Sequence, residues 1–330
     1  MKVLVLSARS RYQRFAPADS AAYRACRLVF CDREASEETW LAAGRDAEAL
    51  VVTPVTPVRA ELIEQMPRLK LIHSEGVGFD RIDLEAARQR GIYVCNNAGC
   101  NAEPVAEHAV MLMTMLLHRA LWGQRMMLEG RQGEAVRCLE EDVPQDLGAV
   151  SVGLVGFGAI GQATAKRLKV SGAEIFYTAR TCRDPALEAE LGAVWLPLPQ
   201  LAARCDIVSL HLPAAADSFH LVDRAFLAAM KPGAYLVNTA RGAVIDDEAL
   251  CAAVRSGHLA GVGLDAYEPE PVPADHPLVC LARDYPDRVI LCPHQGGISL
   301  SAFRRLYGML FDNLGRLQEG QRPLRIVNGL

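Results

Sequence analysis

Three glycines stand at a spacing that binds phosphate in many nucleotide-binding proteins. Gly156, Gly158 and Gly161 form Gly-x-Gly-x-x-Gly within the segment VGLVGFGAIG. The pattern alone is common, but here an apolar run precedes it and a helical pattern follows, ending near Gly172. In that context the glycines allow a tight turn and bring a helix N-terminus close to a pyrophosphate. The segment predicts a dinucleotide site, with an ordinary strand-to-helix turn as the alternative.

The end of the next apolar run bears on which dinucleotide binds. An acid at this position accepts hydrogen bonds from the ribose hydroxyls of NAD and repels the 2′-phosphate of NADP. Here the run AEIFYTAR ends with Ala179 and Arg180, Arg183 follows, and Asp184 is the first acid. Arginine suits a 2′-phosphate, so the sequence favours NADP. The alternative is an exposed Arg180 in a protein that binds NAD through its backbone.

The whole chain limits the classes of function. Its 330 residues suit two domains, and a formal net charge of -4 without a Lys/Arg-rich run predicts neither nucleic acid nor an anionic membrane as partner. None of the ten cysteines forms a CxxC pair, so we expect no metal site, and a reducing cytoplasm is the simplest location. The apolar N-terminal run is expected to be a strand, not a signal peptide, and residues 109–117 a buried helix too short to span a membrane.

Short apolar runs alternate with longer helical patterns along the chain, which is typical of a parallel sheet with helices on both faces. The expected strands are VLVL, ALVVT, LKLIHS and GIYVCN, then SVGLVGF, AEIFYT, IVSLHLP, AYLVNTA, LAGVGLD and RVILCPH. A long apolar helix is expected from Pro104–Val105, and another over about 300–319. Between the first helix and the glycine turn, the polar segment 126–149 is expected to be an arm outside the core.

Three segments together with two upstream motifs resemble one family. They are LVNTARGAVIDDEAL (236–250), GVGLDAYEPEP (261–271) and VILCPHQGG (289–297), after LKLIHSEGVGFDRIDLEAARQRGI and NAEPVAEHAV. In this order they resemble the D-isomer-specific 2-hydroxyacid dehydrogenases, with the glyoxylate/hydroxypyruvate reductase branch closest. The resemblance covers about residue 50 to the end of the chain.

The resemblance implies a catalytic triad. Arg241 would clamp the substrate carboxylate and polarise the keto oxygen with its planar fork. His294 would be the general acid in reduction and the base in oxidation. Glu270, five residues after the aspartate of the GLD motif, would orient the imidazole and favour its charged form. Each residue taken alone would more often be a surface or loop residue, and the motif context decides against that.

The same resemblance implies the other contacts. In the substrate site, the backbone amides of Val77 and Gly78 would bind the carboxylate, assisted by Asn101. The expected cofactor contacts are Gly156, Gly158, Ala159, Ile160, Gly161, Arg180, Leu212, Pro213, Ser218, Thr239, Ala240 and Asp265, the last facing the nicotinamide carboxamide. His108, in a nearly apolar helix, is interpreted as a buried histidine with satisfied hydrogen bonds.

The implied architecture is α/β, with two doubly wound parallel-sheet domains and a cleft between them. Residues 1–100 with 295–330 would form the discontinuous substrate domain, and 101–294 the dinucleotide-binding domain. The arm would contact a twofold partner, giving a homodimer. The implied reaction is hydride transfer between a nicotinamide cofactor and a small 2-keto acid/D-2-hydroxy acid pair.

Two other functions fit this scaffold. A cofactor-sensing corepressor would be expected to carry partner-binding tails, and almost no sequence lies outside the expected fold. A formate- or phosphite-type dehydrogenase has no keto group to protonate, and the formate enzymes have glutamine where Glu270 stands here. The substrate itself is not readable from the sequence.

Overall fold

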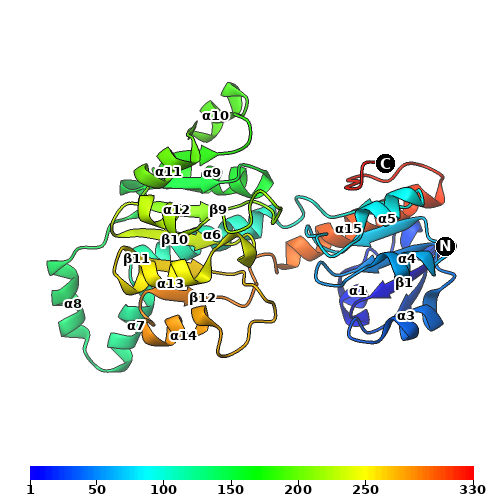
Figure 1. Ribbon diagram of the computed structural model, residues 1–330, viewed down its shortest axis with the longest axis horizontal. Coiled ribbons are helices and arrows are strands. Elements are labelled where there is room, and N and C mark those ends of the chain that lie inside the picture. The colour runs from blue at the N-terminus through cyan, green and yellow to red at the C-terminus, as the bar shows by residue number, and fades with distance from the viewer. The chain divides into compact units, whose positions relative to one another are not determined.

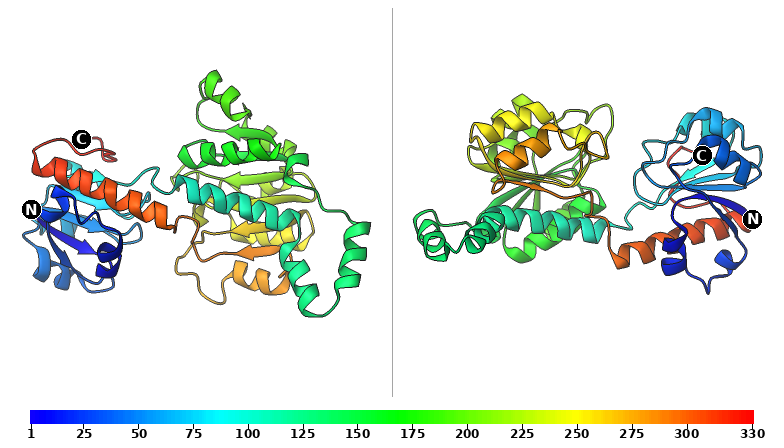
Figure 2. Two further views of the ribbon diagram at one scale, coloured as in Figure 1. Left: turned by 180° about the vertical axis from the view of Figure 1, so that it is seen from behind. Right: turned by 90° about the horizontal axis from the view of Figure 1, so that it is seen from below.

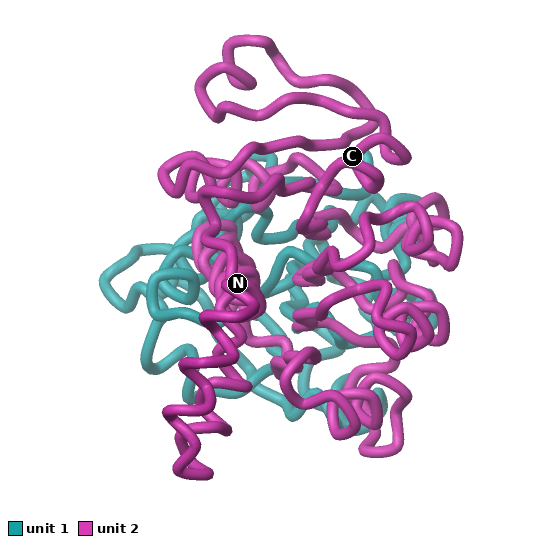
Figure 3. Tube along the Cα trace, turned by 90° about the vertical axis from the view of Figure 1, so that its left-hand side faces the viewer, with its two compact units in different colours: residues 1–101, 298–330 teal, residues 102–297 magenta.

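The computed structural model describes residues 1–330, and its contacts divide the chain into two compact units (Figures 1 and 3). Unit 1 comprises Met1–Asn101 and Ile298–Leu330, and unit 2 comprises Ala102–Gly297. Each unit contains one all-parallel sheet with helices on both faces, which confirms the predicted fold class. Naming the two parts a substrate and a cofactor domain remains a prediction.

Unit 1 is built on a five-stranded sheet of order β2-β1-β3-β4-β5. Its strands are β1 (Lys2–Leu6), β2 (Arg27–Phe30), β3 (Ala49–Val52), β4 (Leu71–Ser74) and β5 (Tyr93–Cys95). One face packs against α3 (Glu37–Gly44), α4 (Ala60–Glu64) and α5 (Leu84–Gln89). The other packs against α1 (Arg9–Phe15), α2 (Ala21–Arg24) and α15 (Leu300–Gln318). The apolar stripe that predicted α15 supplies the core of this second face.

Unit 2 is built on a seven-stranded sheet of order β12-β11-β10-β9-β6-β7-β8. Helices cover both faces of this sheet (Figure 2). Its strands are β6 (Ser151–Val155), β7 (Glu174–Thr178), β8 (Ala193–Trp195), β9 (Ile207–Leu210), β10 (Ala234–Asn238), β11 (Leu259–Leu264) and β12 (Val289–Leu291). One face packs against α6 (Ala102–Leu117), α9 (Ala159–Ser171) and α10 (Pro185–Leu191). The other packs against α11 (Leu198–Arg204), α12 (Arg224–Ala229), α13 (Asp247–Arg255) and α14 (Pro277–Asp284). Short 3-10 turns lie at Leu147–Ala149 and Gly242–Val244.

The strand order of unit 2 reverses between β6 and β9, which pair directly. In an open parallel sheet the connections from two such strands run to opposite faces and leave a crevice outside their carboxyl ends. Ligands of doubly wound sheets bind there. The loops that follow β6, β9 and the neighbouring strands are therefore the expected place for a ligand.

The polar segment expected to be an arm is helical. Residues 126–149 contain the end of α7 (Ala120–Leu128) and all of α8 (Gln132–Glu141), and α8 projects from the body of unit 2 (Figure 1). None of the helices in the chain is both long enough and apolar enough to span a lipid bilayer.

The ten expected strands are all present, but two short strands, β2 and β8, were not expected. Both lie at a sheet edge, where only one neighbour is available. Their side chains are partly exposed, and their apolar runs are only three to four residues long, too short to be distinguished from apolar residues of a loop or helix.

Candidate active site

The glycine turn follows β6 at the strand reversal and is shaped by close backbone contacts. Gly156 has a φ of 97°, and a Cβ there would lie 2.4 Å from the carbonyl oxygen of His211, which follows β9. A Cβ on Gly161 would lie 2.4 Å from the Gly156 carbonyl oxygen. A Cβ on Gly158, in contrast, would meet nothing within 4 Å. The first and third glycines thus allow packing, whereas the second leaves open space beside the backbone.

Helix α9 begins in that open space. Its N-cap residue is Gly158, so no side chain satisfies the N–H groups of its first turn, which includes Ala159 and Ile160. Unsatisfied N–H groups and the helix dipole favour an anion at this point. The residues present therefore fit the pyrophosphate of a dinucleotide.

The loops after β9 and β10 contain the other expected cofactor contacts. Leu212 and Pro213 follow β9, and the Ser218 hydroxyl donates to the Pro213 carbonyl at 2.8 Å, so it closes this loop. After β10, the Thr239 hydroxyl lies 3.5 Å from Nδ1 of the buried His211. The Ala240 N–H donates to the side chain of Asn238 at 2.9 Å. These contacts hold both loops at the carboxyl edge of the sheet.

The loop after β7 contains the arginines expected to contact a 2′-phosphate. The Arg180 guanidinium is 81% exposed and forms an ion pair of 2.8 Å with Asp217, a partner that the sequence did not reveal. Arg183 is half-buried, and its Nε has no hydrogen-bond partner. Ala179 follows the last residue of β7, so no acid stands at this strand end. The loop after β7 therefore contains two arginines, one of them paired with Asp217, and their contact with a cofactor remains a prediction.

Glu270 and His294 meet although they are 24 residues apart. Glu270 lies in the loop after β11, and His294 follows β12. The His294 Nδ1–H donates to Glu270 at 2.7 Å from Oε2 and 2.9 Å from Oε1. Glu270 Oε1 also accepts the Tyr267 N–H at 2.9 Å. Because Nδ1 is occupied, Nε2 is the nitrogen of His294 that remains for a substrate.

The charge on Glu270 is stabilised by these neighbours. Partial burial opposes ionisation, but the hydrogen bonds from His294 and from the Tyr267 N–H hold the pKa of Glu270 below its usual value. The positive charge of Arg241 lowers the same pKa, so the guanidinium is near the pair. Glu270 is therefore a carboxylate at neutral pH, able to stabilise an imidazolium on His294.

Arg241 lies three residues after β10, in a turn that hydrogen bonds hold in place. Its carbonyl oxygen accepts a hydrogen bond of 3.0 Å from Asn238 Nδ2, and its Nη1 donates to the Ala240 carbonyl at 2.7 Å. Asn238 also accepts the Ala240 N–H, so one buried amide side chain shapes the whole turn. The structure thus gathers Arg241, Glu270 and His294 at the carboxyl edge of one sheet, and their catalytic roles remain predictions.

Asp265 follows β11 directly and is almost completely buried. Its Oδ1 accepts the Gln295 N–H and its Oδ2 accepts the Gly296 N–H, both at 2.8 Å. It therefore binds the two residues that follow His294, a contact that sequence reasoning missed. Its expected contact with a carboxamide remains a prediction.

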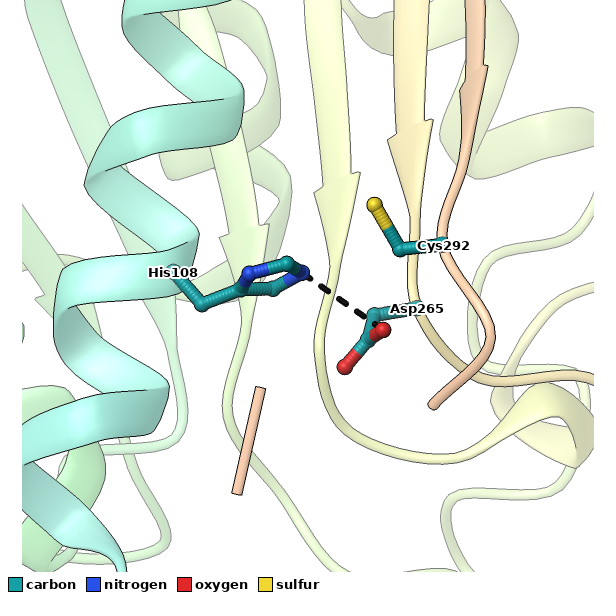
Figure 4. Close-up of side chains that lie close together, drawn as sticks. All are labelled: His108, Asp265 and Cys292. Atoms are coloured by element: carbon teal, nitrogen blue, oxygen red, sulfur yellow. Dashed lines mark ion pairs between the residues drawn. The ribbon is translucent and has the colours of Figure 1, made fainter. Parts of the chain in front are cut away.

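His108 departs from the expectation of a satisfied buried histidine. It is buried on α6, as expected, but its Nε2 has no hydrogen-bond partner. That nitrogen lies 3.5 Å from Asp265 Oδ1, at ion-pair distance, and Cys292 lies beside both (Figure 4). A helix and the ends of two strands bring the three side chains together, so no local spacing could have revealed the group.

Unit 1 contains the residues expected to bind the substrate carboxylate. Val77 and Gly78 follow β4, and their N–H groups donate to no group of the protein. Their carbonyls are held by Asn96 Nδ2 at 2.7 Å and by the Ser74 hydroxyl at 2.6 Å. The Oδ1 atom of Asn101 is buried without a partner. Two adjacent free amides in a fixed turn can bind an anion.

A buried carboxylate that the sequence did not reveal lies beside this turn. Glu75 is 2% exposed and accepts hydrogen bonds of 2.7 Å from the Ser7 hydroxyl and the Tyr12 hydroxyl. The Arg11 guanidinium also pairs with it. All its partners lie at the end of β1 or on α1, more than sixty residues away in the chain, so only the fold brings them together.

Comparisons with known proteins agree with this geometry. Residues 110–296 match the family model of the D-isomer specific 2-hydroxyacid dehydrogenase NAD binding domain. The chain is 36% identical over 284 residues to a glyoxylate reductase of Korarchaeum cryptofilum, covering 86% of this chain and 83% of that protein. It is also 36% identical over 300 residues to a glyoxylate reductase of Thermococcus onnurineus, covering 90% and 87%.

Solved structures give the same result. The D-lactate dehydrogenase of Aquifex aeolicus, complexed with NAD and lactic acid, superposes with a TM-score of 0.85 at 26% identity over 100% of both chains. The holo D-mandelate dehydrogenase of Rhodotorula graminis gives 0.85 at 28% identity over 99% of this chain and 97% of that one. The chain is therefore an oxidoreductase that acts on CH–OH donors, and it belongs to the D-isomer-specific 2-hydroxyacid dehydrogenase family.

Proposed function

We propose that this enzyme reduces a small 2-keto acid to the D-2-hydroxy acid and catalyses the reverse oxidation. The observation that carries the proposal is the hydrogen bond of 2.7 Å between His294 Nδ1 and Glu270, with the charge of Arg241 nearby. Within one sheet edge, this arrangement combines a proton donor, a group that supports its charge and a cation for an anionic substrate.

The three residues divide the work of the reduction. The nicotinamide, when bound, supplies the hydride to the keto carbon. As negative charge develops on the keto oxygen, the Nε2–H of His294 donates a proton to it, and Arg241 stabilises the charge until the proton arrives. Glu270 stabilises the imidazolium before transfer and keeps Nε2 in the correct orientation. In the oxidation, neutral His294 accepts the proton.

The substrate carboxylate needs its own contacts. In unit 1 we assign them to the free N–H groups of Val77 and Gly78, assisted by the side-chain N–H group of Asn101, and in unit 2 to the planar fork of Arg241. Contacts to the carboxylate leave the adjacent keto group for hydride transfer.

We infer that the substrate is small, with glyoxylate and hydroxypyruvate as the first candidates. The curated relatives described above are glyoxylate reductases at 36% identity, and this supports the choice. Steady-state rates with glyoxylate, hydroxypyruvate, pyruvate, phenylpyruvate and 2-ketoisocaproate should give the highest kcat/KM for one of the first two. A clear preference for phenylpyruvate or 2-ketoisocaproate would contradict the assignment, and inactivity with all five would contradict the proposed function.

We propose NADP as the preferred cofactor. The strand end at Ala179 lacks the acid that repels a 2′-phosphate, and Arg180 and Arg183 supply positive charge. The exposed pair of Arg180 with Asp217 is weak enough to be replaced by a phosphate, because such pairs contribute only about 0–1 kcal/mol. The kcat/KM should be higher with NADPH than with NADH, and Ala179→Asp/Arg180→Ile should shift it toward NADH. A wild-type preference for NADH would contradict this.

We propose that the enzyme is a homodimer whose interface includes the arm. Large apolar side chains are exposed there and beside it, including Leu128 on α7 and Val143 after α8, which are 81% and 71% exposed. Met127 and Val136 of the same helices are also 56% and 47% exposed, and exposed apolar side chains gathered in one region mark an interaction surface. Light scattering should give twice the mass of the chain, and Leu128→Asp should reduce it, whereas the control Val194→Asp on the edge strand β8 should not.

We propose a reducing cytoplasm as the location of the enzyme. All ten cysteines are free thiols, which supports this proposal.

A further inference from the structure

One face of helix α6 packs against one face of strand β11. His108, Leu112 and Leu116 are spaced by four residues and therefore lie on one face of α6. Gly261, Gly263 and Asp265 alternate along β11 and its end, so they lie on one face of the sheet. A Cβ on Gly263 or on Gly261 would lie 3.1 Å from Leu112 or Leu116. The two glycines therefore allow the close approach that brings His108 to Asp265.

Asp265 in turn holds the loop of the acid–base residue. His294 has a φ of 55°, a left-handed backbone conformation that is costly for a residue with a side chain. The hydrogen bonds from the Gln295 and Gly296 N–H groups to Asp265 fix the backbone immediately after it. A Cβ on Gly296 would lie 2.9 Å from Asp265 Oδ2 and 3.1 Å from the His108 ring, so His108, Asp265 and the loop are tightly packed.

We propose that the buried His108–Asp265 ion pair positions His294 for proton transfer, so that His108 is a positioning residue of this enzyme. The inference rests on the proposed function of His294. The cation on His108 fixes the Asp265 carboxylate (Figure 4). The carboxylate fixes Gln295 and Gly296, and these hold His294 in its strained conformation. Loss of the cation should loosen the loop without removing any group that contacts the substrate.

The groups that face His108 support a charged imidazole. Asp265 lies on the β11 side and the Cys292 thiol on the β12 side, and interaction with Asp265 and then with Cys292 raises the pKa of His108 to about 9 against the opposing effect of burial. Burial opposes ionisation of Asp265, but His108 and the two backbone N–H groups lower its pKa. The pair is therefore charged at neutral pH and loses its cation as the pH rises through about 9.

A zinc ion is the other possible centre of this cluster. His, Asp and Cys supply the N, O and S atoms that zinc accepts, and the three ligand atoms lie within 4.8 Å of one another. We favour the ion pair because both carboxylate oxygens of Asp265 already accept backbone N–H groups and because a metal would have to displace the His108 proton. The two assignments differ in their response to a chelator.

The first test is the pH dependence of D-2-hydroxy acid oxidation at saturating cofactor. Wild-type kcat should rise with pH and then fall as the pH passes about 9, because His108 loses its charge. His108→Gln should lower kcat at pH 8 by roughly 5- to 50-fold, as expected for lost orientation, and should change KM less. The alkaline fall should disappear in this variant. The matched control is His258→Gln, because His258 lies before β11, at the opposite edge of the sheet, and contacts the Leu227 carbonyl.

A second measurement does not depend on turnover or on folding of the variant. In histidine-labelled wild-type protein, the His108 imidazole resonances should titrate near pH 9, and those of His294 should shift in the same pH range. The inference would be overturned by a wild-type rate profile without an alkaline fall. It would also be overturned if the His294 resonances did not change as His108 titrates. Loss of activity in EDTA with recovery in Zn²⁺ would overturn it too. An enzyme inactive on all 2-hydroxy acids but with coupled His108 and His294 signals would contradict only the proposed function.

Discussion

The carboxyl edges of the two sheets each hold a buried or half-buried glutamate, but the partners of these glutamates differ. In unit 1, Glu75 follows β4 and is bound by Ser7, Tyr12 and Arg11. In unit 2, Glu270 follows β11 and is bound by His294 and by the Tyr267 N–H. Both sheets are parallel and covered on both faces, so the architecture does not explain the difference.

The partners determine what each carboxylate can do. Arginine keeps its proton at any physiological pH. Burial and the charge on Glu75 raise the pKa of Tyr12 well above its usual value, so this hydroxyl keeps its proton too. The Glu75 network is therefore a fixed charge that shapes a loop. Histidine exchanges its proton near neutral pH, so the Glu270 pair can perform acid–base chemistry. The comparison predicts catalytic effects in unit 2 and stability effects in unit 1.

The largest expected effect is on the titratable pair. His294→Ala should lower kcat by roughly 10²- to 10⁴-fold, the contribution of a general acid. NADPH binding, followed by its fluorescence, should persist because the glycine turn is unchanged. Turnover close to that of the wild type would remove His294 from the mechanism.

A smaller effect is expected at Arg241. Arg241→Lys keeps the charge but loses the planar fork, so at least one charge-assisted hydrogen bond to the substrate is lost. Such a bond contributes about 1.5–3 kcal/mol, or roughly 10- to 150-fold in kcat/KM for the keto acid. Cofactor affinity should be retained. A variant that loses cofactor affinity instead would show that Arg241 has another role.

The third effect should appear in stability and not in catalysis. Glu75→Gln leaves the Arg11 charge without its partner, and we expect a loss of about 2–4 kcal/mol in the stability of unit 1, measured by denaturant unfolding. The control Glu48→Gln removes only the exposed pair with Lys70 and should cost about 0–1 kcal/mol. A large fall in kcat of the folded Glu75→Gln protein would break the distinction between the two glutamates.

The smallest effect concerns pH and stability at His108. Its pKa is raised from 6.5 to about 9 in the folded protein, so the folded state binds the proton more tightly than the unfolded state. The stabilisation is complete below about pH 6.5 and is lost as the pH rises through 9. The Tm of the wild type should therefore exceed that of His108→Gln by more at pH 7 than at pH 10. A Tm difference independent of pH would mean that His108 contributes only packing.

The apolar runs of the sequence predicted ten strands and the fold class because strands buried on both faces must be apolar throughout. They missed β2 and β8, whose edge positions leave side chains partly exposed. The glycine turn was predictable because its spacing is local, and the structure accounts for Gly156 and Gly161 by contacts a Cβ would prevent.

Contacts between distant loops were not predictable. The pair of Arg180 with Asp217 joins the loops after β7 and β9, and no spacing within either segment signals it. The sequence contained one weak indication of the contact between His108 and Asp265. Residues spaced by four on α6 lie opposite the two glycines of β11. Recognising it requires the knowledge that these two elements pack together.

The most direct test of the Glu270–His294 pair is its pH dependence in both directions, measured between pH 5 and 8.5. Reduction needs protonated His294 and oxidation needs neutral His294, so kcat/KM should fall with pH for the keto acid and rise with pH for the D-2-hydroxy acid. Glu270→Gln should lower kcat/KM more for reduction than for oxidation, because the carboxylate that stabilises the imidazolium is gone. Profiles that change in the same direction, or a Glu270→Gln variant that reduces the keto acid as fast as the wild type, would contradict the assignment of this pair as the proton-transfer centre.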